Sequence, residues 1–134
     1  MDASLQCDFA PFASPRGPGT ALKLRPGEFL FREGDDADAL FIVTRGTVRI
    51  MSGSVVYEVV HAGGIVGEMA IVDTGAPRSA SVIAGTYAEL VRMDTADFLS
   101  LLATAPDFGL MVMRVMARRL RLMNQRYRPQ GVAW

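Results

Sequence analysis

The sequence predicts a mostly β domain with flanking α-helices, built on a double-stranded β-roll of about eight strands that resembles a jelly roll. Three observations support this fold class. Short β-type segments separated by glycine-containing turns fill most of the chain up to residue 93. Longer segments with helical spacing follow. The 134 residues are enough for one hydrophobic core and too few for two.

The strands are expected where apolar and β-branched residues gather between turns. Pairs such as Pro26-Gly27 and Gly63-Gly64 mark the turns. The residues of a half-buried strand should alternate between the two faces, and the segment 47–51 follows this pattern weakly. The predicted strands are residues 21–24, 28–31, 39–44, 47–51, 55–60, 79–84 and 88–93.

A single helical turn is expected at residues 68–71, and two helices are expected after the last strand. Asp94 or Thr95 is a suitable N-cap for the first of these, because its side-chain oxygen can accept a hydrogen bond from a free backbone N–H. Pro106 separates this helix from a longer one that runs from about Asp107 to about Arg126.

The predicted organisation is one domain between two short terminal segments. Residues 1–19 are rich in Pro, Gly and Ser and are expected to form a flexible arm with at most one helical turn at residues 8–13. The domain covers residues 20–128. Residues 129–134 are expected to form a C-terminal tail.

Composition argues against several kinds of site. The 14 basic and 14 acidic side chains balance, so the chain as a whole is not expected to bind a polyanion. Cys7 and His61 are the only residues of their types, so a disulfide within the chain, a thiolate zinc site and a multi-histidine metal site are excluded. A catalytic triad lacks a credible base, and we expect no catalytic residue, metal or cofactor. The N-terminus has acids and no apolar signal run, so we expect a cytoplasmic protein.

The segment 65–82 carries the groups that point to a function. Gly67 allows a strand to end in a tight turn, and the helical turn that follows has free backbone N–H groups. Arg78 and Ser79 then open the next predicted strand. Small side chains at Ala70 and Ala80 allow a ligand to approach the backbone closely. These groups together predict a site for one phosphate.

Glu68 makes the predicted site more specific. A carboxylate beside a phosphate repels it unless the ligand also carries a hydroxyl group that donates to the carboxylate, as a ribose 2′-OH does. Such a charge-assisted hydrogen bond contributes roughly 1.5–3 kcal/mol. Glu68 and Arg78 therefore favour a phosphate with a neighbouring hydroxyl over a free anion such as sulfate.

These residues resemble the phosphate-binding cassette of the cyclic nucleotide-binding domain family, the domain of catabolite activator protein. Residues 25–35 and 40–48 resemble the first turn and hairpin of that family, and residues 106–124 resemble its closing helix. The resemblance covers about residues 20–126. The matching cassette residues are Gly67, Glu68, Met69 and Ala70, followed by Arg78, Ser79 and Ala80.

The resemblance implies a receptor for cAMP or cGMP and not an enzyme. Glu68 would bind the ribose 2′-OH, and Arg78 and Ser79 would bind the phosphate oxygens. Backbone N–H groups around Met69, Ala70 and Ala80 would complete the site. Met123 and Asn124 fall where the long C-terminal helix would cover the base. The receptor would signal through a conformational change of this helix to an unknown effector protein or to a second copy of the chain.

Two features depart from the family. A Pro/Gly-rich arm stands where relatives have helices before the first strand. Transcription factors of the family continue into a helix-turn-helix domain, whereas this sequence ends at Trp134, and we expect no DNA reading of that kind.

Several alternatives remain open from the sequence. Glu68 and Arg78 could pair with each other in a domain that has lost its ligand. The six arginines within residues 114–128 could bind nucleic acid on a ligand-free roll, although a solvated helix face is the more usual explanation. A β-barrel enzyme of the cupin type is disfavoured by the single histidine.

A heptad-spaced row on the closing helix could pack on its own roll or form a dimer seam. The row consists of Met113, Met116, Leu120, Met123 and Tyr127.

Overall fold

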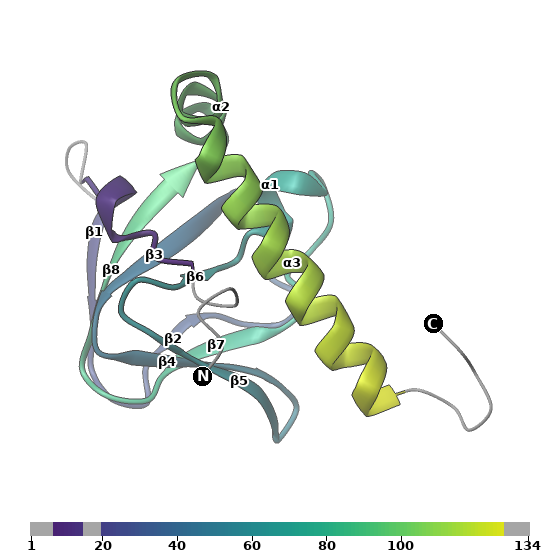
Figure 1. Cartoon of the computed structure of the whole chain (residues 1–134). Coiled ribbons are helices and arrows are strands. Elements are labelled where there is room, and N and C mark those ends of the chain that lie inside the picture. The colour runs from purple at the N-terminus through teal and green to yellow at the C-terminus, as the bar shows by residue number, and fades with distance from the viewer. Residues whose placement is uncertain (1–6, 15–19, 128–134) are drawn as a thin grey trace.

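The described part of the chain forms two four-stranded antiparallel sheets that face each other, with helices along one side (Figure 1). The computed structural model describes residues 7–14 and 20–127. One sheet has the order β1-β8-β3-β6 and the other β2-β7-β4-β5. The strands are β1 (Ala21–Leu24), β2 (Phe29–Phe31), β3 (Ala39–Arg45), β4 (Thr47–Ser52), β5 (Val55–His61), β6 (Ile65–Val66), β7 (Ser81–Ala84) and β8 (Ala88–Asp94).

Strand β3 shows how the roll and the helices share one core. Its first five residues, Ala39 to Val43, are all buried because the strand is covered on both faces. Alternate side chains of a strand point to opposite faces. Phe41 and Val43 accordingly join the core between the sheets, while Leu40 and Ile42 pack against the helices. This explains why residues 39–43 read as an unbroken apolar run.

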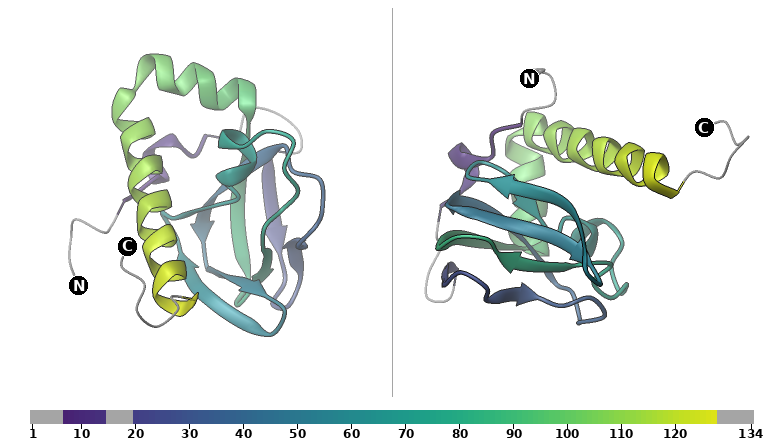
Figure 2. Two further views of the ribbon diagram at one scale, coloured as in Figure 1. Left: turned by 90° about the vertical axis from the view of Figure 1, so that its right-hand side faces the viewer. Right: turned by 90° about the horizontal axis from the view of Figure 1, so that it is seen from below.

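Helices α2 (Thr95–Thr104) and α3 (Pro106–Tyr127) follow the last strand. The Asp94 side chain caps α2 by accepting a hydrogen bond from the Asp97 backbone N–H at 2.9 Å. Helix α3 begins at Pro106 and runs along the outside of the roll, as the two views in Figure 2 show. Its buried residues Phe108, Val112 and Val115 repeat at helical spacing and anchor its first half to the core.

Part of the N-terminal segment is packed against this core, which the sequence did not predict. Phe9 is 0% exposed, and its backbone N–H donates to the Gly63 carbonyl at 2.7 Å. The short 3₁₀-helix η2 (Ala10–Phe12) places Phe12 edge-on against Phe108, with ring centroids 5.1 Å apart. Two aromatic side chains thus hold residues 7–14 against the helices despite the surrounding prolines and glycines. Residues 1–6 and 15–19 of the predicted arm lie outside the described part of the structure.

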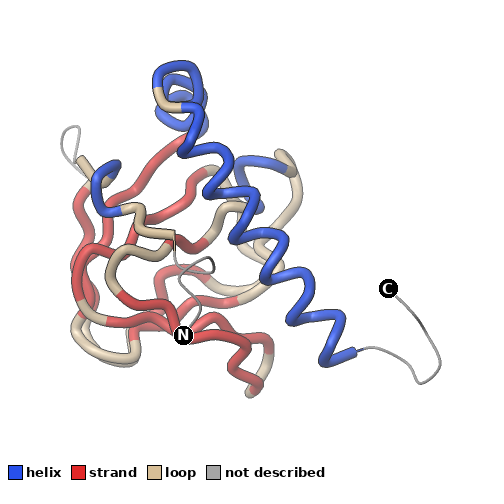
Figure 3. The backbone as a smooth tube through the Cα atoms, viewed as in Figure 1, coloured by secondary structure: helices blue, strands red, loops and turns tan. Residues whose placement is uncertain are grey.

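The predicted fold class is confirmed, and most strand boundaries agree to within one or two residues. The tube in Figure 3 shows the strands gathered into the roll and the helices outside it. Strand β6 was not predicted, because its two residues pair only with Phe41 and Ile42 and give too short a pattern to recognise. Ser79 and Ala80 belong to the loop before β7 and not to the strand itself. The predicted tail, residues 129–134, lies outside the described part.

Among the described residues, no single helix is both long and apolar enough to cross a membrane. Helices α2 and α3 satisfy that test only when taken together, and they meet at a bend of 119°.

Candidate functional site

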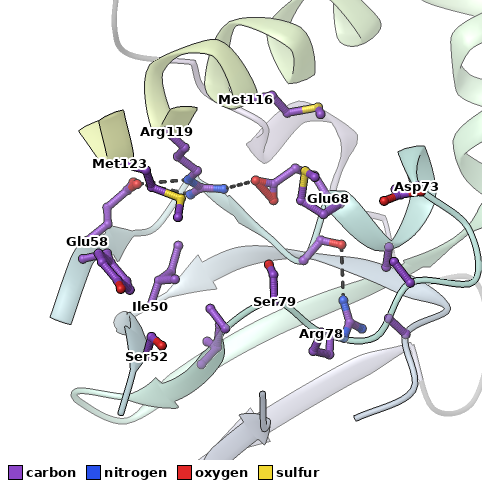
Figure 4. Close-up of a pocket in the computed structure, with 18 of the residues that line it drawn as sticks. Ile50, Ser52, Glu58, Glu68, Asp73, Arg78, Ser79, Met116, Arg119 and Met123 are labelled. Atoms are coloured by element: carbon purple, nitrogen blue, oxygen red, sulfur yellow. Dashed lines mark hydrogen bonds and ion pairs between the residues drawn. The ribbon is translucent and has the colours of Figure 1, made fainter. Parts of the chain in front are cut away.

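A cavity of about 530 Å³ lies between the roll and helix α3 (Figure 4). Its volume falls within the range of about 300–1,000 Å³ that is usual for small-ligand pockets. Strands β4 and β5 form one side, the segment 67–82 with helix α1 (Met69–Val72) forms another, and α3 lies across them. Its lining includes Ile50, Ser52, Glu58, Gly67, Glu68, Met69, Ala70, Arg78, Ser79, Ala80, Met116, Arg119, Leu120 and Met123.

Arg78 lies on the cavity wall with its guanidinium buried; the residue is 7% exposed. Its Nη2 donates to the Ala39 carbonyl at 2.9 Å, and its Nη1 donates to the Gly67 carbonyl at 3.3 Å. The guanidinium lies over the Phe31 ring, 4.0 Å from the ring centroid. The buried Nε has no hydrogen-bond partner among the described residues. The side chain is therefore held in place while part of its donor capacity stays unused.

The charge of Arg78 is not neutralised by an ion pair within the described residues. Burial lowers the pKa of Arg78 from its ordinary value, and the charges of Asp38 and Asp35 oppose this shift. Arginine remains charged at any pH near neutrality. A buried cation that donates its hydrogen bonds to neutral carbonyls is well suited to bind an anion in the adjoining cavity.

Gly67 makes the position of Arg78 possible. Its φ of +79° is a left-handed conformation that favours glycine. A Cβ atom at this position would lie 2.7 Å from Arg78 Nη1 and 3.3 Å from the Ala39 carbonyl oxygen. Gly67 therefore permits both the turn before α1 and the close approach of the guanidinium.

Glu68 faces the same cavity but is held by helix α3. The residue is 5% exposed, and its Oε1 accepts a hydrogen bond from Arg119 Nη1 at 2.5 Å. Arg119 Nη2 also donates to the Ile65 carbonyl at 2.7 Å. Glu68 and Arg78 do not neutralise each other, which removes that alternative. The ion pair with Arg119 engages Oε1 of Glu68, so Oε2 can serve as the acceptor for a ligand.

Glu58 on β5 extends this arrangement into a network of four charges. Its Oε1 accepts from Arg119 Nε at 3.0 Å and its Oε2 accepts from Arg118 Nη2 at 2.9 Å. Burial alone would raise the pKa of Glu58, but the hydrogen bonds and charges of Arg119 and Arg118 outweigh it and lower this pKa. Burial likewise opposes the charge of Arg119, yet Glu68 and Glu58 raise its pKa. Glu58 and Arg119 are therefore ionised near neutral pH.

The structure brings eight of the nine predicted site residues to the cavity wall. Asn124 is half-buried and is not part of the wall. The residues at the wall are Gly67, Glu68, Met69, Ala70, Arg78, Ser79, Ala80 and Met123.

Arg119 and Glu58 also line the cavity, which the sequence did not reveal. Arg119 belongs to the row of six arginines, where no motif around it distinguishes it from the solvated ones. Glu58 lies on the strand β5 and has no motif around it. The helical spacing of Phe108, Val112 and Val115 continues to residue 119, which is the one signal that could have placed this arginine on the inner face.

The arginines of α3 fall into a paired group and an exposed group. Arg118 and Arg119 are paired with carboxylates, while Arg114 and Arg121 are exposed. The side chains of Arg126 and Arg128 lie outside the described part. Pairing of the two central arginines weakens the alternative of a nucleic-acid surface along this helix.

The heptad-spaced row of α3 contains both packed and exposed side chains. Met116 packs against the helix-side core, whereas Met113 is 60% and Leu120 is 62% exposed. Met123 lines the cavity and is 47% exposed, and the Tyr127 side chain lies outside the described part. The row therefore does not pack on its own roll as a whole.

The fold and the cavity define a ligand-binding domain of a known family. A sequence model of the cyclic nucleotide-binding domain matches residues 21–105. The chain belongs to the cyclic nucleotide-binding domain family and is similar to its catabolite activator protein-like members. The resemblance seen in the sequence is thereby confirmed.

The relatives include transcriptional regulators and an enzyme. The chain is 32% identical over 103 residues to a CRP-like cAMP-activated global transcriptional regulator of Mycobacterium tuberculosis, covering 73% of this chain and 46% of the relative. The catabolite activator protein of Thermus thermophilus superposes with a TM-score of 0.70 at 29% identity, covering 79% of this chain and 52% of that one. The EAL enzyme Bd1971 in its cGMP-bound form gives a TM-score of 0.60 at 30% identity, over 78% of this chain and 29% of that one.

The chain spans about half the length of the Mycobacterium tuberculosis regulator and of the Thermus thermophilus protein.

Proposed function

We propose that this domain is a receptor for a cyclic nucleotide, cAMP or cGMP, and that it holds the ligand by its phosphate at Arg78. The observation that carries the proposal is the buried guanidinium of Arg78, which forms no ion pair within the described residues and lies beside a cavity of about 530 Å³ that Glu68 also lines. Glu68 offers an acceptor for a hydroxyl, and Arg78 offers donors for an anion. A cyclic ribose phosphate provides both groups at neighbouring positions.

The walls of the cavity suit the three parts of such a ligand. Arg78 and the hydroxyl of Ser79 would bind the phosphate, with the small side chains of Ala70 and Ala80 leaving room for it. Oε2 of Glu68 would accept the ribose 2′-OH. The base would then lie toward Ile50, where the apolar side chains of α3 approach the roll.

Helix α3 would convey the presence of the ligand to a partner. It lines the cavity through Met116, Leu120 and Met123, and it reaches the proposed ribose site through the ion pair between Arg119 and Glu68. A ligand that binds Glu68 therefore touches a group already connected to the helix. The exposed apolar side chains of α3 support an effector protein or a second copy of the chain as the receiver of this change.

A calorimetric titration with cAMP, cGMP and AMP tests the proposal. We expect cAMP or cGMP to bind at one site per chain. AMP should bind much more weakly, because its phosphate carries an additional negative charge and is not held in a ring next to the 2′-OH. Absence of heat with both cyclic nucleotides, together with an unchanged melting temperature, would refute the proposed function.

A further inference from the structure

A second carboxylate lies in the cavity, away from the phosphate side. Figure 4 shows Glu58 with Ile50 and Ser52 on one side of the cavity and Arg78 on the other. Met123 of α3 lines the same cavity. If the phosphate binds at Arg78 and the ribose at Glu68, this is the side that the base enters.

Glu58 is fixed in one orientation before any ligand arrives. Arg119 Nε donates to its Oε1, and Arg118 Nη2 donates to its Oε2, at 3.0 and 2.9 Å. A longer hydrogen bond of 3.4 Å joins Arg119 Nη2 to Oε2. The side chain is 14% exposed, so its position is set by these arginines and not by bulk water.

The arginines leave acceptor capacity on Glu58. An ionised carboxylate has about four lone-pair sites, and the two arginines engage three of them. Within the described part of the chain, the remaining site is on Oε1, which accepts from Arg119 Nε. A ligand group that donates a hydrogen bond can use this site, whereas a ring nitrogen or carbonyl that only accepts would meet a negative charge.

We propose that Glu58 selects the base of the ligand by accepting a hydrogen bond from an N–H group on the edge of a purine. This inference rests on the proposed function and makes it more specific. Adenine offers its 6-amino group, and guanine offers its ring N–H and 2-amino group. Glu58 is thus compatible with cAMP and with cGMP, and it disfavours a cyclic nucleotide whose base has no donor.

The alternative is that Glu58 only anchors helix α3. Both roles predict that Glu58→Ala weakens the domain, so loss of stability cannot distinguish them. The ratio of the affinities for two ligands can distinguish them. Any contribution of Glu58 to anchoring α3 is the same for both ligands and cancels in this ratio. The suitable pair is cAMP and the 3′,5′-cyclic phosphate of purine riboside, which differ only in the 6-amino group.

The test is a calorimetric titration of both ligands into the wild-type chain, Glu58→Ala and Glu58→Gln. In the wild type, cAMP should bind about tenfold or more tightly than the cyclic purine riboside phosphate, as expected for a hydrogen bond to a charged group. In Glu58→Ala the two affinities should become equal. Glu58→Gln keeps a hydrogen-bond acceptor and should show an intermediate ratio of affinities. This variant replaces Glu58→Ala in the test if the alanine variant does not fold.

Glu89→Ala is the matched control, because Glu89 also pairs with an arginine, Arg45, but on the sheet surface away from the cavity. It should leave the affinity ratio unchanged. Equal binding of the two ligands to the wild type, or a ratio that persists in Glu58→Ala and Glu58→Gln, overturns the role of Glu58 while the proposed function stands. Failure of the wild type to bind any cyclic nucleotide refutes the proposed function itself.

Discussion

At the level of single residues, Arg78 combines burial, charge and unused donors. Its backbone is fixed at both polar groups, since its N–H donates to the Asp35 carbonyl at 2.8 Å and its carbonyl accepts from Gly34 at 2.9 Å. Its side chain is fixed by the two carbonyls and the Phe31 ring described above. A donor group prepared in this way loses little conformational entropy when an anion binds.

Arg78→Ala should therefore reduce cAMP affinity by at least about 100-fold, because two charge-assisted hydrogen bonds of roughly 1.5–3 kcal/mol each are lost. The domain should still fold, with some loss of stability because the Ala39 and Gly67 carbonyls lose their donor, since Arg78 belongs to neither hydrophobic core cluster. Calorimetry measures the affinity, and circular dichroism checks the fold. Arg45→Ala, at an exposed surface pair, is the control. An Arg78→Ala affinity within about twofold of the wild type would contradict the assignment.

Gly67→Ala tests whether cAMP binding depends on the close approach of the Arg78 guanidinium to Gly67. The added Cβ meets the guanidinium, and the positive φ strains any L-residue by about 1–3 kcal/mol. We expect lower stability in urea unfolding and also weaker cAMP binding.

Gly27→Ala is the matched control, because Gly27 has a φ of +85° but a Cβ atom there would have nothing within 4 Å. It should lose stability without losing affinity. If the two alanine variants bind cAMP equally well, the close approach of Gly67 to Arg78 has no role in binding.

At the level of elements, the contact between α3 and the roll changes character along the helix. Its first half is held by apolar packing around Phe108, and its second half by Arg118 and Arg119 on Glu58 and Glu68. Apolar packing is insensitive to pH, whereas the ion pairs are not. The contributions of the two halves to stability can therefore be distinguished by measuring unfolding at different pH values.

Stability should depend on pH through Glu58. Its pKa is lowered in the folded state from an ordinary value of 4.5, so its stabilising contribution is present above that pH and is lost as the pH falls through the lower, folded-state pKa. Arg119→Met should destabilise the chain by about 3 kcal/mol near pH 7, because buried carboxylates lose their partner. The difference in unfolding free energy between wild type and Arg119→Met should shrink at acidic pH.

Urea unfolding of both chains near neutral pH and again below the ordinary pKa of the carboxyl provides the measurement. A difference that is constant across this range would mean that Arg119 acts by packing alone.

Elements with a strong local signal were predictable from the sequence. The apolar run of residues 39–43 indicates strand β3, and the capping residue Asp94 indicates the start of α2. Strand β6 is too short to give a pattern, and Phe9 packs into the core from a segment whose prolines and glycines suggest a loop. The placement of Gly67, Glu68, Arg78 and Ala80 along one cavity wall was predictable because these residues are close in sequence.

The charge network of the site was not predictable in the same way. Arg119 contacts Glu58 and Glu68, which lie on segments far from it in the sequence. No local pattern reports such contacts, because they depend on how α3 packs across the roll.

At the level of the whole molecule, helix α3 presents apolar side chains that the described residues leave uncovered. Met113 and Leu120 lie seven positions apart on the same side of the helix, and both are more exposed than buried. A second copy of α3 could cover them as a heptad seam. We therefore expect a dimer, formed through this helix.

Light scattering after gel filtration measures the molar mass of the chain in solution and so shows whether it is a dimer. Met113→Glu should convert the dimer into a monomer, because it places a charge in the seam. Leu99→Glu on α2 is the matched control, since Leu99 is exposed to a similar degree but lies outside α3. A wild-type chain that is monomeric at high concentration would contradict the seam.

The most direct measurement is a crystal structure of the chain grown with saturating cAMP. We expect the cyclic phosphate on the guanidinium of Arg78, within hydrogen-bond distance, and the 2′-OH on Glu68 Oε2. A nucleotide bound elsewhere, or one in this cavity whose phosphate does not contact Arg78, would contradict the proposed site.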